Sequence, residues 1–148
     1  MGISGAIYKN LYLETIDIFY LEKSLSFYSR GYVLDKNYYN GSNVAICNEL
    51  LCICSTDREE SIFYKLSSRK IREEILQNCI NLLKENELNN VKDIWLYTTL
   101  AGTYLYFDDE EKFEFYRQKF IDFYPNEWQI QAFEKGLAHY EDFINHVK

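Results

Sequence analysis

Three cationic side chains recur at helical spacing in the middle of the chain. Lys65, Arg69 and Arg72 stand at positions i, i+4 and i+7, on one face of a helix predicted over residues 57–86. Three desolvated cations on one face would bind a phosphate or an acidic peptide through charge-assisted hydrogen bonds. The alternative is an ordinary solvated helix face, which we favour because the neighbouring Glu73 and Glu74 can neutralise the cations.

A run of four carboxylates follows at Asp108, Asp109, Glu110 and Glu111. Contiguous exposed carboxylates lack the surroundings that tune a catalytic pair, so catalysis is not expected there. The run is typical of a helix N-terminus, where negative charge interacts favourably with the helix dipole. As an alternative, it forms a docking patch for a basic partner.

Cysteine and histidine offer no metal or nucleophile pattern. Cys52 and Cys54 are not spaced as C-x-x-C, and the two histidines, His139 and His146, lie far from the cysteines in sequence. We expect the four cysteines to be reduced core residues, with a disulfide or metal site as the weaker alternative. No P-loop, G-x-S-x-G or H-E-x-x-H motif occurs, so we predict a protein without cofactor, metal or enzymatic activity.

Composition indicates a folded helical protein of 148 residues. Apolar residues make up 47% of the chain and aromatic residues 18%, which favours a packed core over disorder. A single proline and six glycines are too few for a β-sandwich or barrel. The net charge of −7 argues against a nucleic-acid partner. With no secretory signal and no apolar run of membrane-spanning length, we predict one cytoplasmic domain over residues 1–148.

Apolar periodicity predicts seven helices and no strand. The predicted ranges are 3–16, 19–34, 42–54, 57–86, 91–107, 109–123 and 126–146. Asn40-Gly41 is interpreted as a breaker before the third helix, and Thr56 with Glu59 as a capping box that opens the fourth. Asn126 to Gln129 is expected to cap the last helix.

The apolar positions also predict which helix faces are buried. Residues 57–86 carry a stripe at Ile62, Leu66, Ile71, Ile75, Cys79, Ile80 and Leu83, with Ser67-Ser68 as a weak point or kink. The last helix is expected to bury Trp128, Phe133, Leu137, Tyr140 and Ile144.

Two segments fit the 34-residue tetratricopeptide template. More specific are two ordered motifs, Gly5-Ala6-Ile7-Tyr8-Lys9-Asn10 and the stretch from Gly41 to Leu50. Together they resemble the tetratricopeptide-type region in the TRAF-binding regulatory segment of apoptosis signal-regulating kinases and its bacterial relatives. Ser42 departs from the isoleucine usual in that family, and no kinase motif is present.

The resemblance implies an all-α, right-handed superhelical stack of three helical hairpins closed by a C-terminal capping helix. It further implies a non-enzymatic protein-interaction scaffold or regulatory module, whose partner binds in a groove lined by the first helix of each pair. The residues that it places near this groove are Lys9, Asp17, Tyr39, Glu49, Trp95 and Thr98.

Size and acidity leave a second function open. A small acidic immunity or antitoxin-like protein that neutralises a basic toxin would have the same length and charge. A toxin gene immediately upstream would favour this alternative, whereas a regulatory gene context would favour the scaffold.

Overall fold

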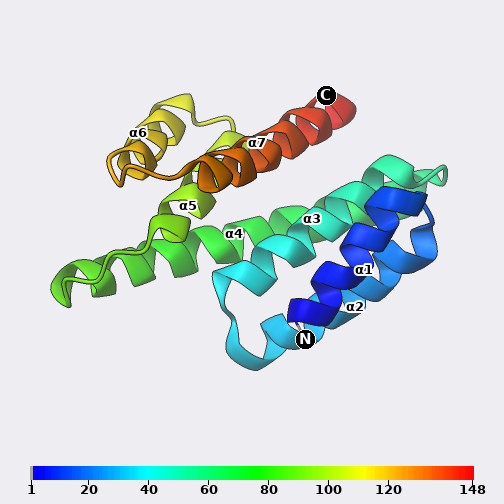
Figure 1. Cartoon of the computed structure of the whole chain (residues 1–148). Coiled ribbons are helices and arrows are strands. Elements are labelled where there is room, and N and C mark those ends of the chain that lie inside the picture. The colour runs from blue at the N-terminus through cyan, green and yellow to red at the C-terminus, as the bar shows by residue number, and fades with distance from the viewer. Residues whose placement is uncertain (1) are drawn as a thin grey trace. The chain divides into compact units, whose positions relative to one another are not determined.

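The computed structural model describes residues 2–148, and every regular element in this range is an α-helix (Figure 1). The helices are α1 Gly2–Thr15, α2 Ile18–Asp35, α3 Tyr38–Cys54, α4 Arg58–Leu88, α5 Ile94–Tyr106, α6 Glu110–Ile121 and α7 Glu127–Val147. No strand occurs between residues 2 and 148, so the predicted all-α class is confirmed. Hairpins α1–α2, α3–α4 and α5–α6 followed by α7 fit a tetratricopeptide-like helical stack.

The start of α3 differs from the prediction. Asn37 is the N-cap, and its side-chain oxygen accepts a hydrogen bond from the Asn40 N–H at 2.7 Å. Asn40-Gly41 therefore lies inside the helix and does not break it. A side-chain carbon at Gly41 would lie 2.8 Å from the Tyr32 ring and 3.0 Å from Ile75, so glycine serves close packing here.

The N-terminal cap predicted for α4 is wrong, whereas the one predicted for α7 is correct. Asp57, not Thr56, caps α4, because its carboxylate accepts from the Glu60 N–H at 2.8 Å. Past this cap α4 runs for 31 residues without interruption, through the serine pair expected to weaken it. At α7, Asn126 is the cap as predicted, and together with Gln129 it forms a capping box.

The chain forms two compact units, which we call unit 1 (residues up to Ile75) and unit 2 (Leu76–Lys148). The boundary falls within α4, so each unit contains part of that helix. Each unit is described by itself below. The single domain predicted over residues 1–148 and the right-handed superhelical stacking stay predictions.

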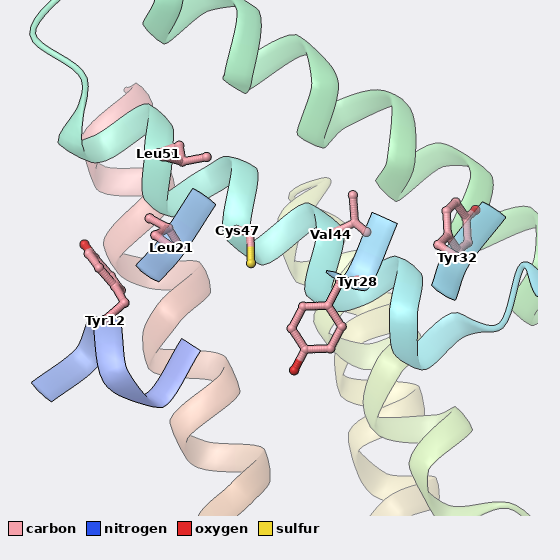
Figure 2. Packing of buried hydrophobic residues seen from close by; sticks show 7 residues of the cluster. All are labelled: Tyr12, Leu21, Tyr28, Tyr32, Val44, Cys47 and Leu51. Atoms are coloured by element: carbon pink, nitrogen blue, oxygen red, sulfur yellow. The ribbon is translucent and has the colours of Figure 1, made fainter. Parts of the chain in front are cut away.

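Unit 1 is built on a cluster of buried apolar side chains from α1, α2 and α3 (Figure 2). Its members are Tyr12, Leu21, Tyr28, Tyr32, Val44, Cys47 and Leu51. The α1 and α2 backbones approach closely at Gly5, whose carbonyl accepts a hydrogen bond from the Ser24 hydroxyl at 2.8 Å. A side-chain carbon at Gly5 would lie 2.9 Å from the buried Tyr28 ring, so only glycine fits there without a shift.

Unit 2 buries aromatic side chains between α5, α6 and α7. Ala101, Phe120 and Phe133 form its apolar cluster, and the Phe120 and Phe133 ring centroids lie 4.8 Å apart. The predicted inward face of α7 is correct for Phe133 and Tyr140, which are buried, and wrong for Trp128, which is 59% exposed. Phe143 was not predicted to face inward, yet it is buried and stacks on Tyr106.

Candidate functional site

The strongest candidate surface in unit 1 is centred on Lys9 of α1. Its ammonium donates a hydrogen bond to Asn43 Oδ1 of α3 at 2.6 Å and lies 5.8 Å from the centroid of the Tyr28 ring. Asn43 is itself oriented, because its amide nitrogen donates to the Tyr39 carbonyl at 2.9 Å. The packing of α1 on α3 therefore fixes a half-buried cation against a tyrosine ring.

Tyr39 extends this surface. Its ring is 53% exposed and meets the edge of the Tyr28 ring at a centroid distance of 6.1 Å. Burial, together with the nearby Tyr39 hydroxyl, raises the pKa of Tyr28, so this side chain stays neutral. We call Lys9 and Tyr39, together with the buried Tyr28 and Asn43 that support them, the Lys9 surface. It offers a half-buried cation and the exposed Tyr39 ring, which suits recognition rather than proton transfer.

Asp17, another predicted partner residue, has a local structural role. Its carboxylate caps α2 by accepting a hydrogen bond from the Phe19 N–H at 2.9 Å. The cap satisfies one of the orphan amides at the start of that helix.

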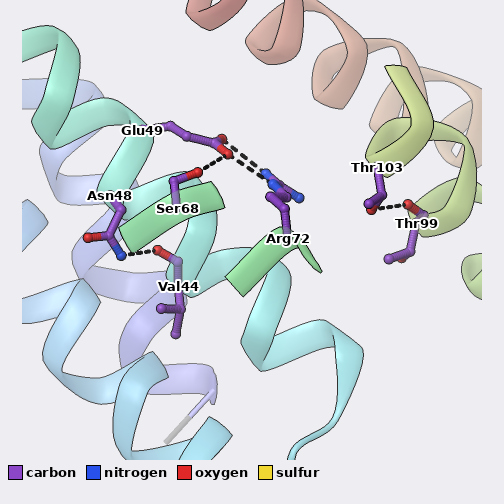
Figure 3. Close-up of polar contacts among 7 residues, drawn as sticks. All are labelled: Val44, Asn48, Glu49, Ser68, Arg72, Thr99 and Thr103. Atoms are coloured by element: carbon purple, nitrogen blue, oxygen red, sulfur yellow. Dashed lines mark hydrogen bonds and ion pairs between the residues drawn. The ribbon is translucent and has the colours of Figure 1, made fainter. Parts of the chain in front are cut away.

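Glu49 does not lie on an open groove, contrary to the sequence prediction. Its side chain is completely buried, and Arg72 of α4 donates to both of its oxygens, at 2.9 and 3.0 Å (Figure 3). The Ser68 hydroxyl donates a further bond at 2.6 Å. This Glu49–Arg72–Ser68 network holds α3 against α4, and a partner cannot reach the carboxylate.

The same network corrects the predicted cation face of α4. Arg72 is fully buried, whereas Lys65 is exposed and Arg69 pairs with Glu73 at 3.3 Å on the surface. The three cations therefore do not share one solvent face. The buried stripe was also misplaced, because Ile62 and Leu66 are exposed while Ser68 and Arg72 lie inside. Ile75 and Cys79 are buried as predicted.

Trp95 and Thr98, the predicted partner residues of unit 2, belong to α5. Trp95 is half-buried, and its ring lies 5.5 Å from the ring of Trp128 in α7. The Thr98 hydroxyl donates to the Trp95 carbonyl at 2.8 Å. The tryptophan pair thus helps to seat α7 on α5, and Thr98 bonds to its own helix.

The acidic run divides into different roles. Asp109 caps α6 through the Lys112 N–H at 3.1 Å and pairs with the Lys112 ammonium at 3.6 Å. Glu110 and Glu111 occupy the first turn of α6, where the helix dipole favours them. Asp108 is exposed, and its backbone has a φ of 63°. The helix-terminus interpretation therefore fits this segment, and docking of a basic partner stays a prediction.

A cleft of about 400 Å³ lies between α2 and α4 in unit 1 and was missed by sequence reasoning. Leu25, Val33 and Phe63 contribute apolar walls, and Lys36 and Lys70 are the cations among its lining residues. The Lys36 ammonium lies 4.5 Å from the centroid of the Tyr32 ring. No sequence motif signals this cleft, because its residues come from helices that are far apart in the chain.

The four cysteines of the chain are the remaining candidates for nucleophilic or metal chemistry. Cys47, Cys52 and Cys79 are buried and all four cysteines are free, as expected for reduced core residues. Burial raises the pKa of the Cys47 thiol to about 11, which keeps it protonated and unreactive. Between residues 2 and 148, no group of His, Cys, Asp and Glu side chains could hold a metal ion.

The helices of the chain differ in length and in apolar character. Within residues 2–148, none combines the length and the apolar character required to cross a bilayer.

The beginning of the chain is similar to a known protein family. A model of the family described as Tetratricopeptide Repeats-Sensor matches residues 1–48. The matched stretch contains Lys9, Tyr28, Tyr39 and Asn43, and it supports a tetratricopeptide-type region there. Such regions typically act as protein-interaction modules without catalytic activity. No curated protein and no solved structure matches the chain.

Proposed function

We propose that the chain is a non-enzymatic protein-interaction module whose partner binds across α1 and α3 at the Lys9 surface. The observation that carries the proposal is the ammonium of Lys9, fixed by Asn43 at 2.6 Å beside the rings of Tyr28 and Tyr39. The matched family model spans all four residues, and its description names a sensor.

The chemistry of the surface suggests what the partner presents. A positioned ammonium favours a carboxylate, and an exposed tyrosine supplies apolar contact at little entropic cost. The surrounding protein carries a net charge of −7, so long-range attraction does not steer an acidic partner. We infer that an acidic group is recognised at short range, as one anchor within a larger contact.

The test uses a double variant and a matched control. Lys9→Met with Tyr39→Ala removes the ammonium and the exposed ring, while Lys23→Met removes an exposed cation of α2 that lies over Phe19. The folded wild-type chain is used as bait in extract from its native host, and captured proteins are identified by mass spectrometry. The partner is then purified and titrated by calorimetry.

We expect the double variant to bind at least about tenfold more weakly, and Lys23→Met to bind like the wild type. Undiminished binding by a double variant with native circular dichroism would overturn the site assignment. Failure to capture any partner that depends on the folded chain would count against the interaction module itself.

Four finer proposals extend this function. Trp95 and Thr98 would contribute contacts from α5, and the acidic run from Asp108 to Glu111 would dock a basic region of the partner. A reducing, cytoplasmic setting is supported by four free cysteines, three of them buried. A regulatory role like that of the kinase segment rests on the resemblance of the Gly5–Asn10 motif.

A further inference from the structure

Unit 2 contains an apolar pocket that neither the sequence patterns nor the proposed function uses. It has a volume of about 510 Å³ and lies between the end of α6 and the first half of α7. The side chains that line it are Arg117, Phe120, Ile121, Tyr124, Pro125, Ile130, Phe133, Glu134 and Leu137. The buried Phe120 and Phe133 anchor it in the core, and Ile121 and Ile130 are 41% and 39% exposed. An open hollow of this size and lining can accept a large apolar side chain.

An exposed aromatic side chain lies beside the hollow. Tyr124 is 93% exposed although it belongs to the pocket lining. Its φ of 52° is unusual for a bulky residue, and its N–H donates to the Ile121 carbonyl at 2.9 Å. Pro125 follows and restricts the chain further. The ring projects into solvent, and exposed aromatic residues commonly anchor protein contacts.

The lining of the pocket also carries one positive and one negative side chain. Arg117 belongs to α6 and Glu134 to α7, and both line the pocket. Arg117 pairs with Glu114 of its own helix at 3.7 Å, with 39% and 62% of the two side chains exposed. Such a surface pair contributes little to stability, so the guanidinium can exchange its partner at low cost.

We propose that the surface formed by this pocket and the Tyr124 ring binds the same surface on a second copy of the chain, forming a symmetric dimer. In a two-fold contact one surface faces itself, so it must be complementary to itself. A projecting ring next to a hollow meets this condition, and so does a cation next to an anion. Tyr124 of each copy enters the pocket of the other, and Arg117 of each copy pairs with Glu134 of the other. A partner of a single charge sign would leave one of these two side chains opposed to like charge.

Charge reversal tests the pairing. Arg117→Glu places Glu against Glu134 twice in the symmetric contact, and Glu134→Arg places Arg against Arg117 twice. The double variant Arg117→Glu/Glu134→Arg restores opposite charges across the two-fold axis. Lys135→Glu is the control, because it changes the charge of an exposed position beside Glu134 that does not line the pocket.

Dimerisation is measured by sedimentation equilibrium over a range of concentrations, with circular dichroism to verify folding. We expect each single reversal and Tyr124→Ala to weaken the dimer at least tenfold, the double reversal to recover it, and Lys135→Glu to leave it unchanged. A wild-type chain that stays monomeric at millimolar concentration would overturn the proposal. So would a dimer that Tyr124→Ala leaves intact, or a double reversal as weak as the single ones. These results are independent of the Lys9 surface, which belongs to unit 1.

Discussion

The two units pack their helices through different kinds of buried side chain. The interior of unit 1 contains Glu49, Arg72, Ser68 and several asparagines, whereas unit 2 buries no charged side chain within residues 76–148 and buries, besides tyrosines, the polar Thr103. Unit 2 relies on paired rings, such as Tyr104 with Tyr116 at 5.6 Å and Tyr106 with Phe143 at 5.9 Å.

This difference predicts which kinds of substitution destabilise each unit. Polar contacts are directional, and a buried charge that loses its partner keeps the full cost of desolvation. Contacts between rings are spread over many atoms, so a side chain of similar shape retains most of the stabilisation. The stability of unit 1 should therefore depend on the chemical identity of a few buried polar atoms. The stability of unit 2 should depend on the volume that its buried side chains fill.

The largest effect is expected when the buried carboxylate is neutralised. Glu49→Gln removes no heavy atom, yet it replaces the carboxylate that accepts two bonds from the buried Arg72 with a neutral amide, at a cost of roughly 3–5 kcal/mol. Phe120→Leu removes several carbons from unit 2 and should cost only about 1–2 kcal/mol. Hydrogen exchange resolved along the sequence would report both, with protection lost in unit 1 for Glu49→Gln. Equal losses for the two variants would remove the contrast between the units.

The second-largest loss of stability is expected where α1 and α2 approach closely. Gly5→Ala drives a methyl group into the buried Tyr28 ring and should destabilise unit 1 by about 1–3 kcal/mol. Gly136→Ala is the matched control in α7, since nothing lies within 4 Å of the added carbon. This control should stabilise unit 2 by about 0.5–1 kcal/mol, because alanine favours the helix. Chemical denaturation measures both, and a Gly5→Ala protein as stable as the wild type would mean that Tyr28 can move aside.

A smaller effect isolates one hydrogen bond of the network. Ser68→Ala removes the donor at 2.6 Å from Glu49, and the carboxylate keeps its two bonds from Arg72. We expect a loss of about 1–2 kcal/mol. The neighbouring Ser67→Ala should stay within about 0.5 kcal/mol, since Ser67 is only half-buried beside the α2–α4 cleft. Similar urea midpoints for the two variants would contradict the importance assigned to the Ser68 hydroxyl.

The smallest effect comes from the exposed ion pair on α4. Arg69 and Glu73 lie at 3.3 Å with 64% and 58% of their side chains exposed. Arg69→Ala should change the free energy of unfolding by no more than about 0.5 kcal/mol. A thermal melt in low and in high salt would verify this, and a loss comparable to that of Glu49→Gln would show that exposure does not separate the two pairs.

Local patterns were enough to predict the all-α class and the cap of α7. Asn126 and Gln129 are three residues apart, and the capping box they form depends only on the chain between them. The start of α3 was mispredicted because Asn40-Gly41 is typical of a turn in isolation. In the fold, Gly41 packs against Tyr32 and Ile75, so tertiary contact decides in favour of the helix.

The candidate site was only partly predictable for a related reason. Lys9 and Tyr39 came from the family resemblance, and both lie on the Lys9 surface. Glu49 and Arg72 were expected at the surface, because charged residues are almost never fully buried unless paired. Their pairing joins positions 23 residues apart in different helices, and nothing in either local sequence signals it.

The tryptophan pair has an optical consequence. Trp95 and Trp128 are the two tryptophans of the chain, and their rings lie 5.5 Å apart at an angle of 41°. All indole emission therefore originates in unit 2, and two rings this close should show coupled transitions in the near-ultraviolet dichroism. Thermal unfolding followed by fluorescence with excitation at 295 nm therefore detects the separation of α5 from α7. It does not detect the unfolding of unit 1, which contains tyrosines but no tryptophan.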